Sequence, residues 1–187
     1  MAKYEKIIKG LRLFRIFHRY LGVTLAALLL ISALTGILLS LKKDIDIIQP
    51  PTQKGTKAQL VDWKPLQDLS QIAQDALISQ YPEQTTNSVD RLDVRPSKGI
   101  VKVLFENGYW EVQVDGTSGE VLSIAKRHSD WIEALHDGSI ISDLFKLISM
   151  NFLGFGVICL LLTGLWLWYG PKRLRRLKRR RTKTNQP

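Results

Sequence analysis

The sequence predicts a membrane α-helical hairpin of two transmembrane helices, with an α+β domain inserted between them. Two stretches, residues 20–41 and 147–169, contain no charged side chain. At ~1.5 Å of rise per residue, each is long enough to cross the ~30 Å hydrocarbon core of a bilayer. The polar region between them, residues 42–146, contains one helical pattern followed by four strand patterns. That order is typical of a small α+β domain.

The charged residues divide the chain into segments of opposite sign. Residues 1–19 carry six basic residues and one acidic residue, residues 170–187 carry nine basic and no acidic residues, and residues 42–143 carry eleven basic against sixteen acidic residues. Basic flanks of membrane helices remain in the cytoplasm. We therefore expect both termini in the cytoplasm and residues 42–143 in the periplasm.

The basic tail after the second apolar stretch has two interpretations. The segment from Lys172 to Arg181 is basic enough to resemble a nucleic-acid-binding arm. Directly after a membrane helix, however, such a segment is more simply an orientation signal that contacts anionic lipid headgroups. We therefore expect the lipid bilayer as a partner and no nucleic acid.

The first apolar stretch is expected to remain in the mature protein. A signal peptide also follows a basic region, but its apolar core is shorter and ends at small residues. Here Lys42, Lys43 and Asp44 follow the stretch. We accordingly divide the chain into a cytoplasmic amphipathic segment (1–19), a transmembrane helix (20–41), a periplasmic region (42–143), a second transmembrane helix (144–169) and a basic cytoplasmic tail (170–187).

The inserted domain is predicted to be one helix packed on an antiparallel sheet. Apolar residues recur at spacings of three and four between Pro65 and Pro82, which predicts a helix over residues 65–81. Asn107 and Gly108 separate two alternating runs and predict a hairpin. The strands are expected at residues 89–95, 100–106, 109–114 and 120–125, after a loop or extended arm at residues 52–64. The single cysteine allows no internal disulfide, and the core is expected to contain Leu69, Ile72, Ala76, Leu92, Val101, Val103, Trp110 and Val112.

Three histidines and two glycines are the candidate site residues. Gly22 and Gly36 lie four and eighteen residues after His18, so all three share one helical face. Small residues on one face let either another helix or a flat ligand come close. An imidazole at the mouth of a membrane helix is either an interfacial or capping residue, or a ligand of a metal or haem. His128 and His136 lie eight residues apart before the second stretch, where a short helix would place both near one face.

Five motifs make the sequence similar to a known family. Residues 114–122 (Val-Asp-Gly-Thr-Ser-Gly-Glu-Val-Leu) end a helix-and-strand region, about residues 65–126, that resembles a PepSY domain. The whole arrangement resembles the PepSY-associated transmembrane family. The other matching motifs are residues 18–22 (His-Arg-Tyr-Leu-Gly), 34–38 (Leu-Thr-Gly-Ile-Leu), 135–138 (Leu-His-Asp-Gly) and 162–166 (Leu-Thr-Gly-Leu-Trp). Larger members of that family have four or more spans and include haem-carrying inner-membrane reductases of ferric siderophores.

The resemblance implies haem b held by two histidines, with His18 and His136 as axial ligands of the haem iron and Gly22 and Gly36 beside the porphyrin. His18 belongs at the inner mouth of the first helix and His136 on the outer side of the second, so one haem cannot use both within a chain. A homodimer would form a four-helix bundle with an inner haem between two His18 residues and an outer haem between two His136 residues. His128 is either an alternative outer ligand or a surface residue beside Lys126 and Arg127.

Polar and aromatic residues of the second span have alternative roles. Asn151 is expected to bond to another helix or to a haem propionate. Trp166, Trp168 and Tyr169 form an interfacial aromatic belt, with an electron or quinone relay as the alternative.

Two functions follow from these features. The first is a haem-bearing membrane electron carrier, in effect a haem-dependent reductase of ferric iron or ferric siderophore on the periplasmic side. The sequence contains no glycine-rich nucleotide or flavin motif, so a quinol or a separate reductase would donate the electrons. The second is a non-enzymatic, membrane-tethered PepSY module that binds a periplasmic protein, in which case the histidines are structural.

Overall fold

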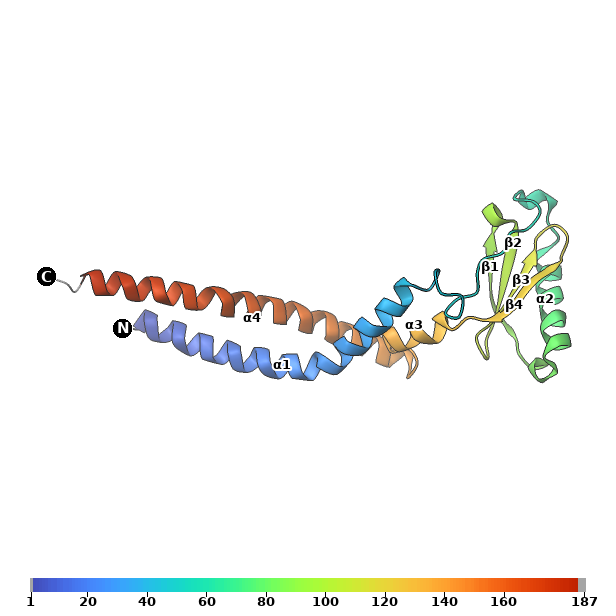
Figure 1. Cartoon of the computed structure of the whole chain (residues 1–187). Coiled ribbons are helices and arrows are strands. Elements are labelled where there is room, and N and C mark those ends of the chain that lie inside the picture. The colour runs from blue at the N-terminus through green and yellow to red at the C-terminus, as the bar shows by residue number, and fades with distance from the viewer. Residues whose placement is uncertain (1, 185–187) are drawn as a thin grey trace. The chain divides into compact units, whose positions relative to one another are not determined.

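The computed structural model describes the backbone of residues 2–184 (Figure 1). The chain divides into two compact units. The first unit, residues 1–34 and 135–187, is a helical hairpin. The second unit, residues 35–134, is an α+β domain. This architecture confirms the predicted fold class of two long apolar helices that flank an α+β insert.

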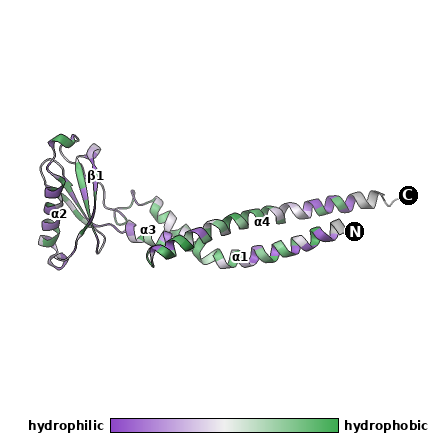
Figure 2. Ribbon diagram, turned by 180° about the vertical axis from the view of Figure 1, so that it is seen from behind, coloured by the Kyte–Doolittle hydropathy of each residue, from purple (hydrophilic) through white to green (hydrophobic). Residues whose placement is uncertain are grey.

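Two long helices form the hairpin, α1 (Ala2–Ser40) and α4 (Asp143–Thr184). Both are long and apolar enough to cross a membrane, and Figure 2 shows the hydrophobic residues along them. The basic N-terminal segment runs into the first apolar stretch as one continuous helix. The helix α4 likewise continues through Pro171 into the basic tail, although proline removes one backbone hydrogen bond there.

The two helices pack in antiparallel directions through small residues. Gly22 on α1 faces Leu160 of α4, and Leu25 on α1 faces Gly156. A methyl group on Gly156 would overlap the Leu25 side chain, which is itself fully buried. The helices therefore approach closely where α4 lacks a side chain, as small residues permit in membrane helix pairs.

A short helix, α3 (Ser129–Asp137), precedes α4. Gly138 ends it with a φ of 85°, a left-handed conformation that favours glycine. Asp137 accepts a hydrogen bond from the backbone N–H of Ser139 at 2.9 Å and pairs with Lys146 of α4 at 2.5 Å. These two interactions of the Asp137 carboxylate stabilise the connection between α3 and α4.

The α+β domain contains one helix and a four-stranded antiparallel sheet in the order β1-β2-β3-β4. The predicted strand order is confirmed, but the β2-β3 turn is longer than expected. It spans four residues, 106–109, and both Gly108 and Tyr109 have positive φ angles. The elements are α2 (Leu66–Gln80), β1 (Val89–Arg95), β2 (Ile100–Phe105), β3 (Trp110–Asp115) and β4 (Val121–Lys126), with 3-10 turns at Leu60–Asp62, Pro82–Gln84 and Pro96–Lys98.

The helix α2 covers one face of the sheet, as Figure 1 shows. Most of the predicted core residues lie in this cluster, but the helix contributes Ala73 and Leu77 where we expected Ala76. Ile72 and Leu92 lie at the edge of the cluster, half-buried. The buried core consists of Leu69, Ala73, Leu77, Val101, Val103, Phe105, Trp110, Val112 and Val114.

The opposite face of the sheet is also buried, although its central residues are largely polar. The predicted arm covers it: Gln113 accepts a hydrogen bond from the backbone N–H of Gln53 at 2.8 Å and donates one to the Pro51 carbonyl at 3.0 Å. Asp115 accepts one from the backbone N–H of Thr56 at 2.6 Å. The buried residues of this face are Ile100, Lys102, Leu104, Glu111, Gln113 and Asp115.

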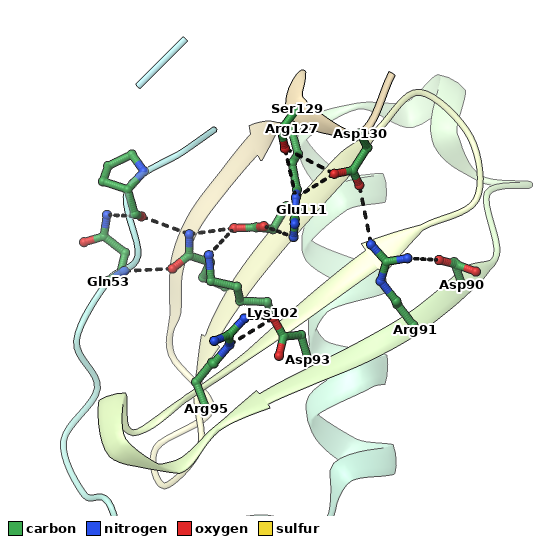
Figure 3. A network of polar contacts seen from close by, with 12 residues as sticks. Gln53, Asp90, Arg91, Asp93, Arg95, Lys102, Glu111, Arg127, Ser129 and Asp130 are labelled. Carbon is green, nitrogen blue, oxygen red and sulfur yellow. Dashed lines mark hydrogen bonds and ion pairs between the residues drawn. The ribbon is translucent and has the colours of Figure 1, made fainter. Parts of the chain in front are cut away.

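An ion-pair network lies on that face (Figure 3). The buried Lys102 pairs with Glu111 at 3.0 Å, and Arg127 pairs with the other Glu111 oxygen at 3.3 Å. Arg127 also pairs with Asp130 at 2.8 Å, which in turn contacts Arg91 at 3.6 Å. Each buried charge of this network therefore has an opposite charge in contact, as burial requires.

Candidate functional site

The imidazole of His18 is held by a hydroxyl from the opposite helix. His18 Nδ1 lies 2.8 Å from Thr163 Oγ1. The single proton of Thr163 is directed to backbone carbonyls of its own helix, with Cys159 O at 2.7 Å and Leu160 O at 3.1 Å. The Thr163 oxygen therefore accepts a hydrogen bond from Nδ1–H. In the neutral imidazole, this leaves Nε2 unprotonated, with the lone pair that binds metal.

The surroundings of this imidazole, which with Thr163 we call the His18 site, include an unpaired donor. Trp166 lies one turn beyond Thr163, and its Nε1–H is buried without an acceptor among the described residues. Its ring is 6.2 Å from the ring of Phe14. A methyl group on Gly164 would lie 3.5 Å from His18 Cε1, so the glycine adjoins the imidazole ring. Buried hydrogen-bond donors normally have partners. The Trp166 N–H is therefore available to donate a hydrogen bond to an acceptor group.

A basic cavity lies among the same two helices, nearer their basic ends. Its volume is about 340 Å³, and Arg12, Arg15 and Arg175 line it together with Ile8, Leu11 and Leu174. Guanidinium groups bind carboxylates through paired hydrogen bonds. Arg15 precedes His18 by one helical turn. The cavity therefore offers carboxylate-binding groups close in sequence to the imidazole.

The two candidate glycines have different positions. Gly22 faces α4, and a methyl group there would be in ordinary contact with Leu160 at 3.8 Å. Gly36 lies near the end of α1, in the part of that helix that belongs to the α+β unit. The contact at Gly22 is helix packing, so its proposed place beside a porphyrin remains a prediction, as does that of Gly36.

His136 lies in the last turn of α3, beside a small apolar cavity. Its backbone carbonyl accepts a hydrogen bond from Ser32 Oγ at 3.3 Å. The cavity has a volume of about 140 Å³, and its apolar lining includes Leu28, Phe145 and Leu153. A dry cavity of ~150 Å³ binds a benzene-sized molecule. This cavity is therefore smaller than a porphyrin.

The neighbouring carboxylate of Asp137 titrates well below its ordinary range. Burial alone would raise the pKa of Asp137, but hydrogen bonds from Lys146 and Ser139 outweigh burial and lower the pKa to about 2. Asp137 is therefore ionised at neutral pH and bound to Lys146. Its role is to hold the connection beside His136.

His128 precedes α3 and is half-buried. The side chain of its neighbour Arg127 is 14% exposed and paired with Glu111 and Asp130. Lys126 stacks over the Trp110 ring at 5.0 Å. Because Lys126 is exposed and Arg127 is not, the surface position of His128 stays a prediction, as does its role as an outer ligand.

The two main candidate histidines, His18 and His136, lie far apart in the direction of α1. Ser32, which contacts the His136 carbonyl, lies fourteen residues beyond His18, or ~21 Å of helix rise. His18 and His136 of one chain are too far apart to bind one iron atom. Across the described residues, no group of three or more His, Cys, Asp or Glu side chains could hold a metal ion.

Comparison with known families agrees with this architecture. The family described as the PepSY-associated TM region matches the chain over residues 15–186. The chain belongs to this family. The match includes His18, Thr163, α1 from residue 15 onward and the whole of α4, and it confirms a membrane protein with PepSY character. No curated protein matches this PepSY-associated TM protein.

Haem, the cofactor that the resemblance implies, fits the His18 site by its chemistry. His18 would supply Nε2 to the iron, and the arginines of the basic cavity or the Trp166 N–H would bind propionate oxygens. Sequence reasoning missed Thr163, although the residue stands in the Leu-Thr-Gly-Leu-Trp motif. The Asn151 amide donates to the Leu147 carbonyl of its own helix at 2.7 Å, and its bond to another helix or to a haem propionate stays a prediction.

Proposed function

We propose that this PepSY-associated TM protein is a haem-binding electron carrier of the bacterial cytoplasmic membrane. In this proposal it works as a homodimer and reduces ferric iron or a ferric siderophore on the periplasmic side. The observation that carries the proposal is the hydrogen bond from His18 Nδ1–H to Thr163. A purely interfacial histidine has no need of a partner that fixes its tautomer. An axial ligand does, because the hydrogen bond at one ring nitrogen orients the other toward the metal.

Two chains are needed to complete each site. One chain supplies one imidazole at the His18 site and one at His136, separated by ~21 Å of helix. Two His18 side chains would ligate one haem b, and two His136 side chains a second. Haem b with two imidazole ligands supplies one-electron transfer, with no open position for oxygen chemistry. An electron would therefore move along the helices in two steps, by way of the haem at His18 and the haem at His136.

The charge distribution supports the direction of electron flow. With both basic segments in the cytoplasm, the His18 site would lie toward the cytoplasm and His136 toward the periplasm. A quinol or a separate reductase would deliver electrons, and the α+β domain would receive the ferric substrate or bind a periplasmic protein. If the purified protein binds no haem, the tethered binding module is the correct interpretation.

Visible absorption spectra of purified variants test the proposal. Reduced wild-type protein is expected to show the sharp, split bands of low-spin bis-imidazole haem. His18→Ala should remove one haem and leave the outer one, and His136→Ala should do the opposite. His128→Ala is the matched control, with an unchanged spectrum. If His128→Ala instead removes the outer haem, His128 is the outer ligand.

A further inference from the structure

A cavity in the α+β domain gathers much of that domain's positive charge. Its volume is about 340 Å³, within the ~300–1,000 Å³ range of small-molecule sites. Residues 42–143 are acidic overall, yet six of their eleven basic residues line this one cavity, against a single acidic residue, Asp93. The six are Lys42, Lys43, Arg95, Lys98, Lys102 and Arg127.

The strand register explains how some of these charges meet. Asp93 of β1 is paired directly with Lys102 of β2, so both project from the sheet face opposite α2. Arg95 lies two residues beyond Asp93 and therefore shares that face, as Figure 3 shows. Lys42 and Lys43 follow α1, and Lys98 lies in the turn between β1 and β2. Segments far apart in sequence thus contribute to one basic cavity.

Three of the six positive charges are compensated within the protein. Glu111 pairs with both Lys102 and Arg127, Asp130 also pairs with Arg127, and Asp93 pairs with Arg95 at 2.6 Å. The other three, Lys42, Lys43 and Lys98, have no ion-pair partner within the described part of the chain. Three uncompensated ammonium groups around one cavity repel one another, and a bound anion would relieve that repulsion.

A neutral polar group completes the lining. Gln49 borders the cavity, and its side-chain oxygen is buried without a hydrogen-bond partner among the described residues. The oxygen and nitrogen of an amide exchange positions when the group rotates by half a turn. With the nitrogen turned inward, Gln49 donates to a bound oxygen atom. The unpaired amide is therefore suited to a ligand rich in hydrogen-bond acceptors.

We propose that this cavity binds a small polycarboxylate of about three negative charges. The uncompensated lysines come from two separate segments, so they match charge spread over several carboxylates better than one compact phosphate. The guanidinium of Arg95 and the amide of Gln49 supply directional donors to carboxylate oxygens. The site uses no residue of the His18 site, and its occupation does not depend on haem.

Calorimetric titration of citrate into the full-length protein tests the proposal. The protein is placed in nanodiscs of phosphatidylcholine, which has no net charge. We expect saturable binding, weakened by added salt because exposed charges are screened. The double variant Lys43→Gln with Lys98→Gln should bind citrate at least tenfold more weakly. Both side chains are exposed, so their replacement should leave the fold intact, as thermal unfolding would show.

The matched control is Lys57→Gln, which removes one positive charge outside the cavity, where Lys57 pairs with Asp62. Its citrate affinity should equal that of the wild type. Inorganic phosphate should bind at least tenfold more weakly than citrate. The proposal is overturned if citrate does not bind, if phosphate binds as tightly, or if Lys57→Gln weakens binding as much as the double variant. It is also overturned if nanodiscs of phosphatidylglycerol abolish citrate binding, because a lipid headgroup would then occupy the cavity.

Discussion

Thr163 of α4 accepts a hydrogen bond from the imidazole of His18 on α1 at 2.8 Å, while its own proton is directed to the Cys159 carbonyl. The arrangement leaves the second nitrogen of His18 available to a metal. It also joins the two membrane helices at one point. Loss of the hydroxyl would therefore affect both the tautomer of His18 and the packing around it.

We predict that Thr163→Val weakens haem binding by ~10–100-fold, the usual effect of removing a group that orients a metal ligand. Valine keeps the shape of threonine but cannot accept the Nδ1–H. Thr163→Ser retains the hydroxyl and should restore most of the affinity. Haem titration followed by absorbance measures both. Equal affinities for wild type and Thr163→Val would remove the proposed role of the hydroxyl.

The packing of the two long helices predicts opposite effects at two neighbouring glycines. Gly156 faces Leu25 with no room for a methyl group, whereas nothing lies near Gly154. Gly156→Ala should destabilise the hairpin by ~1–3 kcal/mol through overpacking. Gly154→Ala should be neutral, or stabilise by up to ~1 kcal/mol, because alanine is the better helix former. Thermal unfolding in detergent compares the two variants, and equal stabilities would contradict the close helix contact.

The buried ion pairs of the sheet predict a large effect at Glu111 and a small one at an exposed acid. Glu111→Gln would leave Lys102 buried without an opposite charge and should cost ~3–5 kcal/mol. The exposed pair of Asp90 with Arg91, at 3.5 Å, should contribute at most ~1 kcal/mol, as Asp90→Asn would show. Protease resistance and thermal unfolding of the full-length protein measure both. If the Glu111→Gln variant proved as stable as the Asp90→Asn variant, the burial of Lys102 would be contradicted.

These contrasts show which features a sequence can predict. The membrane spans, α2 and the strands follow from local patterns of charge and spacing, so they were predictable. The alternation along β2 and β3 does not report that Lys102 and Glu111 are buried. They are buried because a distant arm, held by Gln113, covers that face. The His18–Thr163 contact joins residues 145 positions apart, and no local pattern reports such a partner.

Acid should loosen the connection between α3 and α4. The pKa of Asp137 falls from 3.8 to about 2 on folding, so its contribution to stability is fully present above about pH 4 and disappears as the pH falls toward 2. At ~1.4 kcal/mol per pKa unit, the contribution is up to about 2 kcal/mol. Asp137→Asn should be less stable than wild type at pH 6, and the gap should close on acidification. A gap independent of pH would contradict the pairing with Lys146.

The most direct test of the central claim is the haem content of the purified full-length protein, measured together with its molar mass in mild detergent. The account predicts a dimer with about one haem per chain when both sites are filled. About half a haem per chain would indicate a dimer with one filled site. A colourless monomer that remains so after haem is supplied would contradict the account.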